Sequence, residues 1–122
     1  MEDVVAYRGR RFLIEYAICT NGSCPAKEFF DSLLERDQAK LMALFVRMGD
    51  EGSIRNEEKF KRIEGTEYFA FKSFQTRVIS CFQPGRRLIL LCGLGKKKDR
   101  YPPAEIERAN RIFKEHKGRQ SE

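Results

Sequence analysis

Two stretches in the first half of the chain repeat apolar residues at intervals of three and four, which is the period of an amphipathic helix. The first runs from Pro25 to about Glu35 and starts at a proline, a residue pre-organised for the first turn of a helix. The second runs from Asp37, a helix-capping residue type, to Gly49 or Gly52. The apolar positions are Ala26, Phe29, Phe30, Leu33 and Leu34, then Leu41, Leu44, Phe45 and Met48. We expect two helices that pack as a hairpin.

The other apolar segments have the lengths and residue types of β-strands. They span residues 11–18, 68–74, 77–82 and 87–94. Gln75-Thr76 joins the second segment to the third as an antiparallel hairpin, and Pro84-Gly85 has the residue types of a type II turn. The last segment is almost continuously apolar, which is typical of a central strand covered on both faces. Pro102-Pro103 then starts a final amphipathic helix, which Lys117-Gly118 closes.

The predicted order of elements is strand, helix, helix, three strands, helix, or β-α-α-β-β-β-α. This order indicates an α+β fold in which an antiparallel sheet packs on the helical hairpin. If the first strand pairs with the central strand, the sheet has four strands. The last helix either packs against the sheet or is exchanged with a partner, so the sequence assigns no oligomeric state. A chain of 122 residues predicts a single domain over residues 1–122, with its core at about 10–117.

Composition narrows the class of protein. Hydrophobic residues make up 41% and charged residues 34%, a globular balance. The longest apolar run, residues 88–94, is far shorter than the roughly 20 residues of a membrane span, and the acidic start Met1-Glu2-Asp3 is unlike a secretory signal. We therefore expect a cytoplasmic protein with no membrane partner. The cysteines lack the spacing of a zinc site, and we expect them to be free, buried thiols: Cys19, Cys24, Cys81 and Cys92.

The net charge of +6 is concentrated in one part of the sequence. Residues 55–100 hold twelve basic and five acidic residues, a net charge of +7, and the rest of the chain has a net charge of −1. This concentration favours a surface that binds a polyanion such as a nucleic acid. The alternative is that these charges keep strand edges soluble.

Several kinds of chemistry find no support in the sequence. It has no Walker loop, no dinucleotide-binding glycine motif and no paired-cysteine motif, so we expect no cofactor. The strands between Tyr68 and Leu94 hold no Asp or Glu, so we expect no metal site of the nuclease type. The one histidine, His116, is interpreted as a solvated side chain at a helix C-terminus. RNA leaves a metal-free route open, because its own 2′-hydroxyl can attack the adjacent phosphate.

Basic residues are suited to that reaction. Lys72 and Arg77 flank the tight turn and are expected to share a surface, where a guanidinium clamps phosphate oxygens and a crowded lysine has its pKa lowered into a useful range. Tyr101 is placed to stack on a base or donate a proton. Nearby residues expected to bind RNA are Lys59, Lys61, Arg62, Lys96, Lys98 and Arg100. The alternative is that Lys72 and Arg77 are ordinary hairpin charges and Tyr101 only packs over the last helix.

Two stretches resemble a known group of proteins. One is Tyr68-Phe69-Ala70-Phe71-Lys72 with the strand start Arg77-Val78-Ile79. The other is Leu90-Leu91-Cys92-Gly93-Leu94-Gly95-Lys96-Lys97-Lys98 with the helix start Tyr101-Pro102-Pro103-Ala104-Glu105-Ile106. On these residues, the chain from about Arg10 to Lys117 resembles the RelE/ParE toxin superfamily, in particular its phage-derived HigB-like branch. Four residues differ from the family pattern, which has Glu, Arg, His and Phe at these places: Ala70, Lys72, Cys92 and Leu94.

The resemblance implies the toxin of a type II toxin–antitoxin system, a ribosome-dependent endoribonuclease that cuts mRNA in the ribosomal A site. Its implied partners are a cognate antitoxin, typically a helix-turn-helix protein, together with the ribosome and mRNA. Lys72, Arg77 and Lys97 are then the predicted catalytic residues, with Tyr101 and the other basic residues binding RNA. Two alternatives stay open. One is a ParE-like inhibitor of DNA gyrase that cuts no RNA, and the other is a non-catalytic basic module that binds RNA or a protein.

Overall fold

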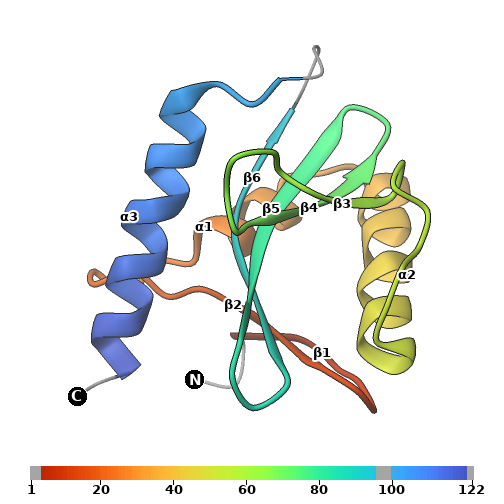
Figure 1. The fold of residues 1–122 in the computed structure, drawn as a ribbon, viewed down its shortest axis with the longest axis horizontal. Helices are drawn as coiled ribbons and strands as arrows, with labels where there is room; N and C mark the ends of the chain where they lie inside the picture. The colour runs from red at the N-terminus through yellow and green to blue at the C-terminus, as the bar shows by residue number, and fades with distance from the viewer. Residues whose placement is uncertain (1–3, 96–99, 121–122) are drawn as a thin grey trace.

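A computed structural model describes residues 4–95 and 100–120 of the chain (Figure 1). Within these residues, three helices and six strands form a mixed α+β fold, which confirms the predicted class. The helices are α1 (Pro25–Asp31), α2 (Glu35–Glu51) and α3 (Pro103–Gln120). The strands are β1 (Val5–Arg8), β2 (Leu13–Tyr16), β3 (Phe60–Arg62), β4 (Phe69–Ser73), β5 (Thr76–Gln83) and β6 (Arg87–Gly95), in the order β1-β2-β6-β5-β4-β3 across one sheet.

The sheet is larger than predicted, and one of its strand pairs is parallel. β1 and β3 were not predicted, because they are only four and three residues long and, unlike the four-residue β2, do not lie within a longer apolar segment. β2 pairs with the central strand β6, a pairing that the sequence left open, and it does so in parallel, from Leu13 opposite Arg87 to Tyr16 opposite Leu90. The prediction of an antiparallel sheet is therefore wrong at this pair, because alternation of side chains fixes their faces but not the direction of a neighbouring strand.

Helices α1 and α2 cover one face of the sheet and α3 covers the other (Figure 1). The first two contact each other as the hairpin prediction requires, since the rings of Phe30 and Phe45 lie 6.1 Å apart and Gln38 Nε2 donates a 2.8 Å hydrogen bond to the Phe30 carbonyl. Of the two predicted stops for α2, Gly52 is correct, since it caps the helix with φ of 82°. Gly49 lies inside the helix.

Strand β6 is buried on both faces, as its apolar run predicts. Leu88 and Leu90 pack in the core under α1 and α2, whereas Ile89 and Leu91 pack in the core under α3. Along β5 the pairing steps from Cys92 to Leu90 at consecutive residues, so Leu91 is the extra residue of a β-bulge. The bulge keeps residues 91 and 92 on the α3 side and shifts the phase of the strand beyond them.

The shifted end of β6 brings Gly93 against α1. A Cβ at this position would lie 2.1 Å from the Phe29 ring, closer than any real contact. The missing side chain thus lets α1 lie directly on the central strand, and this close approach is the physical reason for a glycine here.

Hydrogen bonds hold the C-terminal half of α3 against the segment that follows β2. His116 is only 3% exposed, and its Nδ1 accepts a 3.0 Å hydrogen bond from the Ile18 amide. Glu115 accepts a 2.8 Å bond from the Thr20 amide. The prediction of a solvated His116 is therefore wrong. Its spacing from Ala109 and Ile112, both buried, places it on the inner face of the helix.

All four cysteines lie within the described residues and are free thiols, three buried and Cys24 half-buried. Burial raises the pKa of the Cys81 thiol to about 12. The prediction of free, buried thiols is therefore confirmed for Cys19, Cys81 and Cys92, and Cys24 is less buried than predicted. Among the described helices, none has the length and apolar character needed to cross a bilayer.

Candidate functional site

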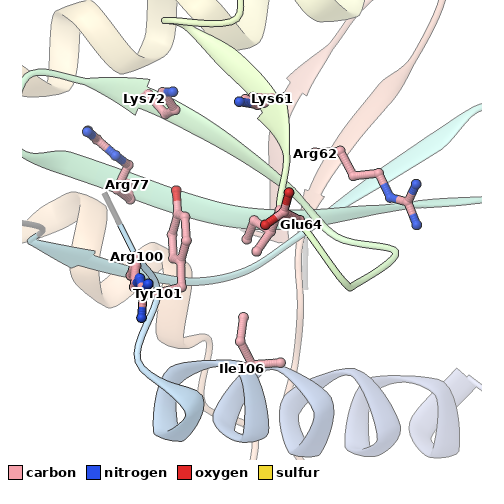
Figure 2. Close-up of a pocket in the computed structure, with 9 residues that line it drawn as sticks. Lys61, Arg62, Glu64, Lys72, Arg77, Arg100, Tyr101 and Ile106 are labelled. Atoms are coloured by element: carbon pink, nitrogen blue, oxygen red, sulfur yellow. The ribbon is translucent and has the colours of Figure 1, made fainter. Parts of the chain in front are cut away.

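A cleft of about 610 Å³ lies on the α3 side of the sheet (Figure 2). It is bounded by β3 with the turn that follows it, by the hairpin of β4 and β5, and by the segment that leads into α3. The described residues that line it include five basic side chains and one carboxylate. They are Lys61, Arg62, Ile63, Glu64, Lys72, Arg77, Arg100, Tyr101 and Ile106. The cleft thus collects residues from both ends of the basic segment of the sequence.

Lys72 and Arg77 form one cross-strand pair of this cleft. They stand directly opposite each other in the antiparallel register of β4 and β5. Ala70, two residues before Lys72, packs in the core under α3, so alternation along the strand places Lys72 on the same side. Opposed residues of such a pair have Cβ atoms about 5 Å apart. Two positive side chains therefore project side by side from the sheet.

The guanidinium of Arg77 is held by the turn that joins the two strands. Its Nη1 donates to the carbonyl of Phe74 and, at 2.9 Å, to the carbonyl of Thr76. These bonds fix the plane of the guanidinium at the cleft. The guanidinium is a rigid, planar group with five N–H donors, so hydrogen bonds from one nitrogen also fix the directions of the N–H groups that remain available to a ligand.

Tyr101 reaches the same place from the segment before α3. Figure 2 shows its ring rising from this segment toward the hairpin, with the hydroxyl directed to the side where Arg77 and Lys72 lie. Burial raises the pKa of the Tyr101 hydroxyl above 10, and the positive charge of Arg77 opposes part of that rise. The phenol is therefore neutral at physiological pH, and its oxygen is buried within the cleft wall. Tyr101 therefore forms the wall of the cleft next to Arg77.

The edge strand β3 and the turn after it supply the third wall. Lys61 pairs with Ala70 and is exposed on the cleft side. Arg62 also lines the cleft, but its Nε donates a 2.6 Å bond to the Thr66 carbonyl, and its guanidinium points away from Lys72 and Arg77 in Figure 2. Its role is to close the turn that follows β3.

Glu64 is the carboxylate that the sequence analysis missed. It lies in the tight turn from Ile63 to Thr66, which is closed by a 3.1 Å bond from the Thr66 amide to the Ile63 carbonyl, with Gly65 at φ of 79°. Glu64-Gly65 between two apolar stretches is a turn signal in the sequence. Glu64 precedes the strands between Tyr68 and Leu94, which hold no Asp or Glu, so the strand pattern gives no sign of it.

The predicted site residues divide into three groups. The cleft brings together six of them: Lys61, Arg62, Lys72, Arg77, Arg100 and Tyr101. Lys59 is exposed just before β3 and does not line the cleft, although its carbonyl accepts a 2.8 Å bond from the Lys72 amide. Lys96, Lys97 and Lys98 lie outside the described residues.

The positions that depart from the family pattern are mainly core positions. Ala70 and Cys92 are buried beneath α3, and Leu94 packs against the same cluster. Burial raises the pKa of the Cys92 thiol to about 11, so it is uncharged. A carboxylate or imidazole at these places would meet apolar neighbours. Lys72 differs, since it faces the cleft and offers a point charge where an arginine would offer a two-pronged contact.

Comparison with known families gives one match. Residues 28–114 match the family described as "Phage derived protein Gp49-like (DUF891)". This match covers well over half of the 122 residues, and the chain belongs to this family. The matched segment runs from α1 into α3 and contains every residue that lines the cleft. No curated protein matches the chain.

Proposed function

We propose that this protein is the toxin of a type II toxin–antitoxin system, a RelE/ParE-type, HigB-like endoribonuclease that cuts mRNA on the ribosome. The observation that carries the proposal is the basic cleft in which Lys72 and Arg77 are paired across two strands. Membership of a phage-derived family and the resemblance of two sequence stretches to these toxins point the same way.

The charges of the cleft support a phosphate ligand. Two like charges directly opposite each other destabilise a sheet, and Lys61 and Arg100 add to the repulsion. A phosphate bound between Lys72 and Arg77 offsets that repulsion, because its oxygens accept charge-assisted hydrogen bonds from both cations. The cleft is therefore better suited to an anion than to an apolar or cationic ligand.

The proposed reaction needs only groups of the RNA and of this chain. The 2′-oxygen attacks the adjacent phosphorus and loses its proton, the bond from phosphorus to the 5′-oxygen breaks, and that oxygen gains a proton. The products are a 2′,3′-cyclic phosphate and a 5′-hydroxyl. Arg77 and Lys72 stabilise the extra negative charge on the phosphorane, which is typically the largest contribution that a site makes to such a step.

Proton transfer is assigned to the polar groups around that pair. Glu64, the carboxylate among the described lining residues, takes the proton of the 2′-hydroxyl. A lysine ammonium, either Lys72 or the sequence-predicted Lys97, protonates the leaving oxygen. The partners in this proposal are the ribosome with its mRNA, in the cytoplasm, and an antitoxin encoded beside the toxin.

The test is induced expression of wild type, Arg77→Ala and Arg47→Ala in a bacterial host. Protein and DNA synthesis are followed by pulse labelling, and mRNA ends are mapped by primer extension. Arg47 is a matched control because it is an exposed arginine of α2, on the other face of the sheet. We expect wild type and Arg47→Ala to stop translation and create new ends within translated codons. Arg77→Ala should lose this activity by about 100-fold or more while staying folded by circular dichroism.

Other outcomes overturn the proposal. Loss of DNA synthesis with translation intact would identify a gyrase inhibitor. Normal growth with the folded wild-type protein would identify a non-catalytic binding module. New mRNA ends with folded Arg77→Ala would remove Arg77 from the site.

A further inference from the structure

Phe74 stands out among the described hydrophobic side chains by its exposure. It lies in the two-residue turn between β4 and β5, and 75% of its surface is accessible. Another exposed ring, Phe82, is 37% accessible and packs against Phe12 and Phe69 with ring centroids 5.2 Å away in both cases. Phe82 is thus part of an aromatic cluster, whereas burial gives no reason for the ring of Phe74.

The backbone at Phe74 adds to this. Its φ is 53°, in the left-handed region that two-residue hairpin turns usually give to Gly, Asn or Asp. A phenylalanine is strained there, because its Cβ crowds the backbone. Fold stability therefore favours another residue at this position on two counts, exposure and conformation. Such a residue is a candidate for function.

The surroundings of Phe74 identify its ligand. Arg77 Nη1 donates to the Phe74 carbonyl, so the cationic centre of the cleft and this residue are held together. Lys40 of α2 places its Nζ 4.0 Å from the centroid of the ring. An exposed aromatic ring flanked by cations that can hold phosphates is the arrangement with which proteins bind single-stranded nucleic acids, where the ring stacks on a base.

We propose that Phe74 is a stacking platform for one unpaired base of an RNA strand whose phosphate lies between Lys72 and Arg77. The inference rests on the proposed function for the RNA itself, and it adds a contact that reads the base next to the cleft. Lys40 supports one face of the ring, and the base covers the other. The strained backbone and the Arg77 bond keep the ring at the tip of the hairpin, ready for the base.

The first test uses the fact that the chain has no tryptophan. In Phe74→Trp, the new indole is the only one and reports on its own surroundings. We expect the indole fluorescence to be quenched when a short single-stranded RNA is added. The Kd from this titration should equal the Kd that the anisotropy of labelled RNA gives for the wild-type protein. Phe82→Trp is the control, because Phe82 is near the opposite end of β5. Its fluorescence should not change. Equal quenching in both variants, or none in Phe74→Trp although RNA binds, overturns the inference.

The second test compares Phe74→Asn with Phe74→Tyr by anisotropy on the same RNA. Asparagine suits the left-handed backbone but cannot stack as a ring does, so this variant should melt no lower than wild type yet bind about tenfold more weakly. Tyrosine keeps the ring and should bind within about twofold of wild type. Unchanged RNA affinity in Phe74→Asn overturns the inference and leaves the proposed function standing. The same holds if this variant loses toxicity in cells while its RNA affinity is kept, since the ring then contacts a protein. Failure of wild type to bind RNA overturns both.

Discussion

The two faces of the sheet are closed in different ways. Under α1 and α2, the aromatic rings of β3 and β4 pack continuously, with Phe71 5.0 Å from Phe45 and 4.8 Å from Phe60 between ring centroids. Under α3, the apolar cover stops partway. Ala109 and Ile112 lie on the sheet, but the segment that enters the helix leaves room for the cleft.

Neighbouring residues on strand β4 therefore face different surroundings. Phe71 is fully buried in the first core, and Lys72 lines the cleft on the other side. The difference teaches that one strand can have a structural face, packed in a core, and a cleft face, lined with charge, at the same point along its length. The core holds the backbone rigid, and the rigid backbone fixes the spacing of the two cleft cations.

The largest effect is expected from the structural face. Phe71→Ala removes a ring from a closed core and should lower the free energy of unfolding by about 3–5 kcal/mol. Its neighbour variant Lys72→Ala should stay within about 0.5 kcal/mol of wild type, because it removes one of two like charges. Urea denaturation of both variants measures this contrast. Equal losses in the two would contradict the division between faces.

The next largest loss of stability is expected where α1 packs closely on β6. Gly93→Ala places a methyl group against the Phe29 ring and should cost about 1–3 kcal/mol of folding free energy. Gly118→Ala is the matched control on α3, since a Cβ there meets nothing within 4 Å and alanine favours a helix. Thermal melts should therefore move in opposite directions. A stable Gly93→Ala would show that α1 is not seated on β6 as described.

The packing of α3 on the sheet is expected to make the free energy of unfolding depend on pH. Burial lowers the pKa of His116 below 6.5, with Arg87 and Arg119 acting in the same direction and Glu15 against it. As the pH falls below about 6.5, the unfolded chain binds this proton more readily than the folded chain, so stability is complete above this pH and falls as the solution is acidified. Between pH 7.5 and 5.5 the loss should reach up to about 1 kcal/mol.

His116→Gln is the comparison for this slope. The variant cannot bind the proton, so its stability should be flat over the same range, measured by urea denaturation at each pH. Glu115, whose pKa is lowered by its bond to the Thr20 amide, acts only in more acidic solution and does not obscure the result. A slope that persists unchanged in His116→Gln would assign it to another group.

The smallest effect on stability is expected from the cleft face. Lys72→Gln should leave stability almost unchanged and reduce the dependence of RNA affinity on salt, lowering the slope of log K against log salt by about 0.7. Lys114→Gln, at an exposed position of α3, is the control and should keep the wild-type slope. Equal slopes in wild type and Lys72→Gln would remove this lysine from the phosphate contacts.

Local patterns determined much of the fold. Helical spacing located α1, α2 and α3, and the apolar run 87–94 identified the central strand, because burial of one or two faces leaves a periodic mark on a sequence. The sequence placed Lys72 and Arg77 on either side of one tight turn, and the structure confirms that they share a surface. The predicted turn residues, Gln75-Thr76, are wrong by one position, because they would set Lys72 opposite Ile79. The chain turns at Phe74-Gln75 instead, and a two-residue connection there sets Lys72 opposite Arg77. Six of the ten predicted site residues line one cleft, because they flank this turn or lie close to it in the sequence.

Tertiary structure decided the rest. It set the parallel direction of β2 against β6, buried His116, and turned Arg62 away from the cationic pair to the Thr66 carbonyl. It also brought Glu64 and Tyr101 to the same cleft from segments about 37 residues apart in the sequence. Each of these features depends on contacts between segments that are distant in the sequence. A local sequence pattern does not show which distant segments make contact. The sequence by itself determined which residues form the elements and carry the charge, and packing determined which of them meet.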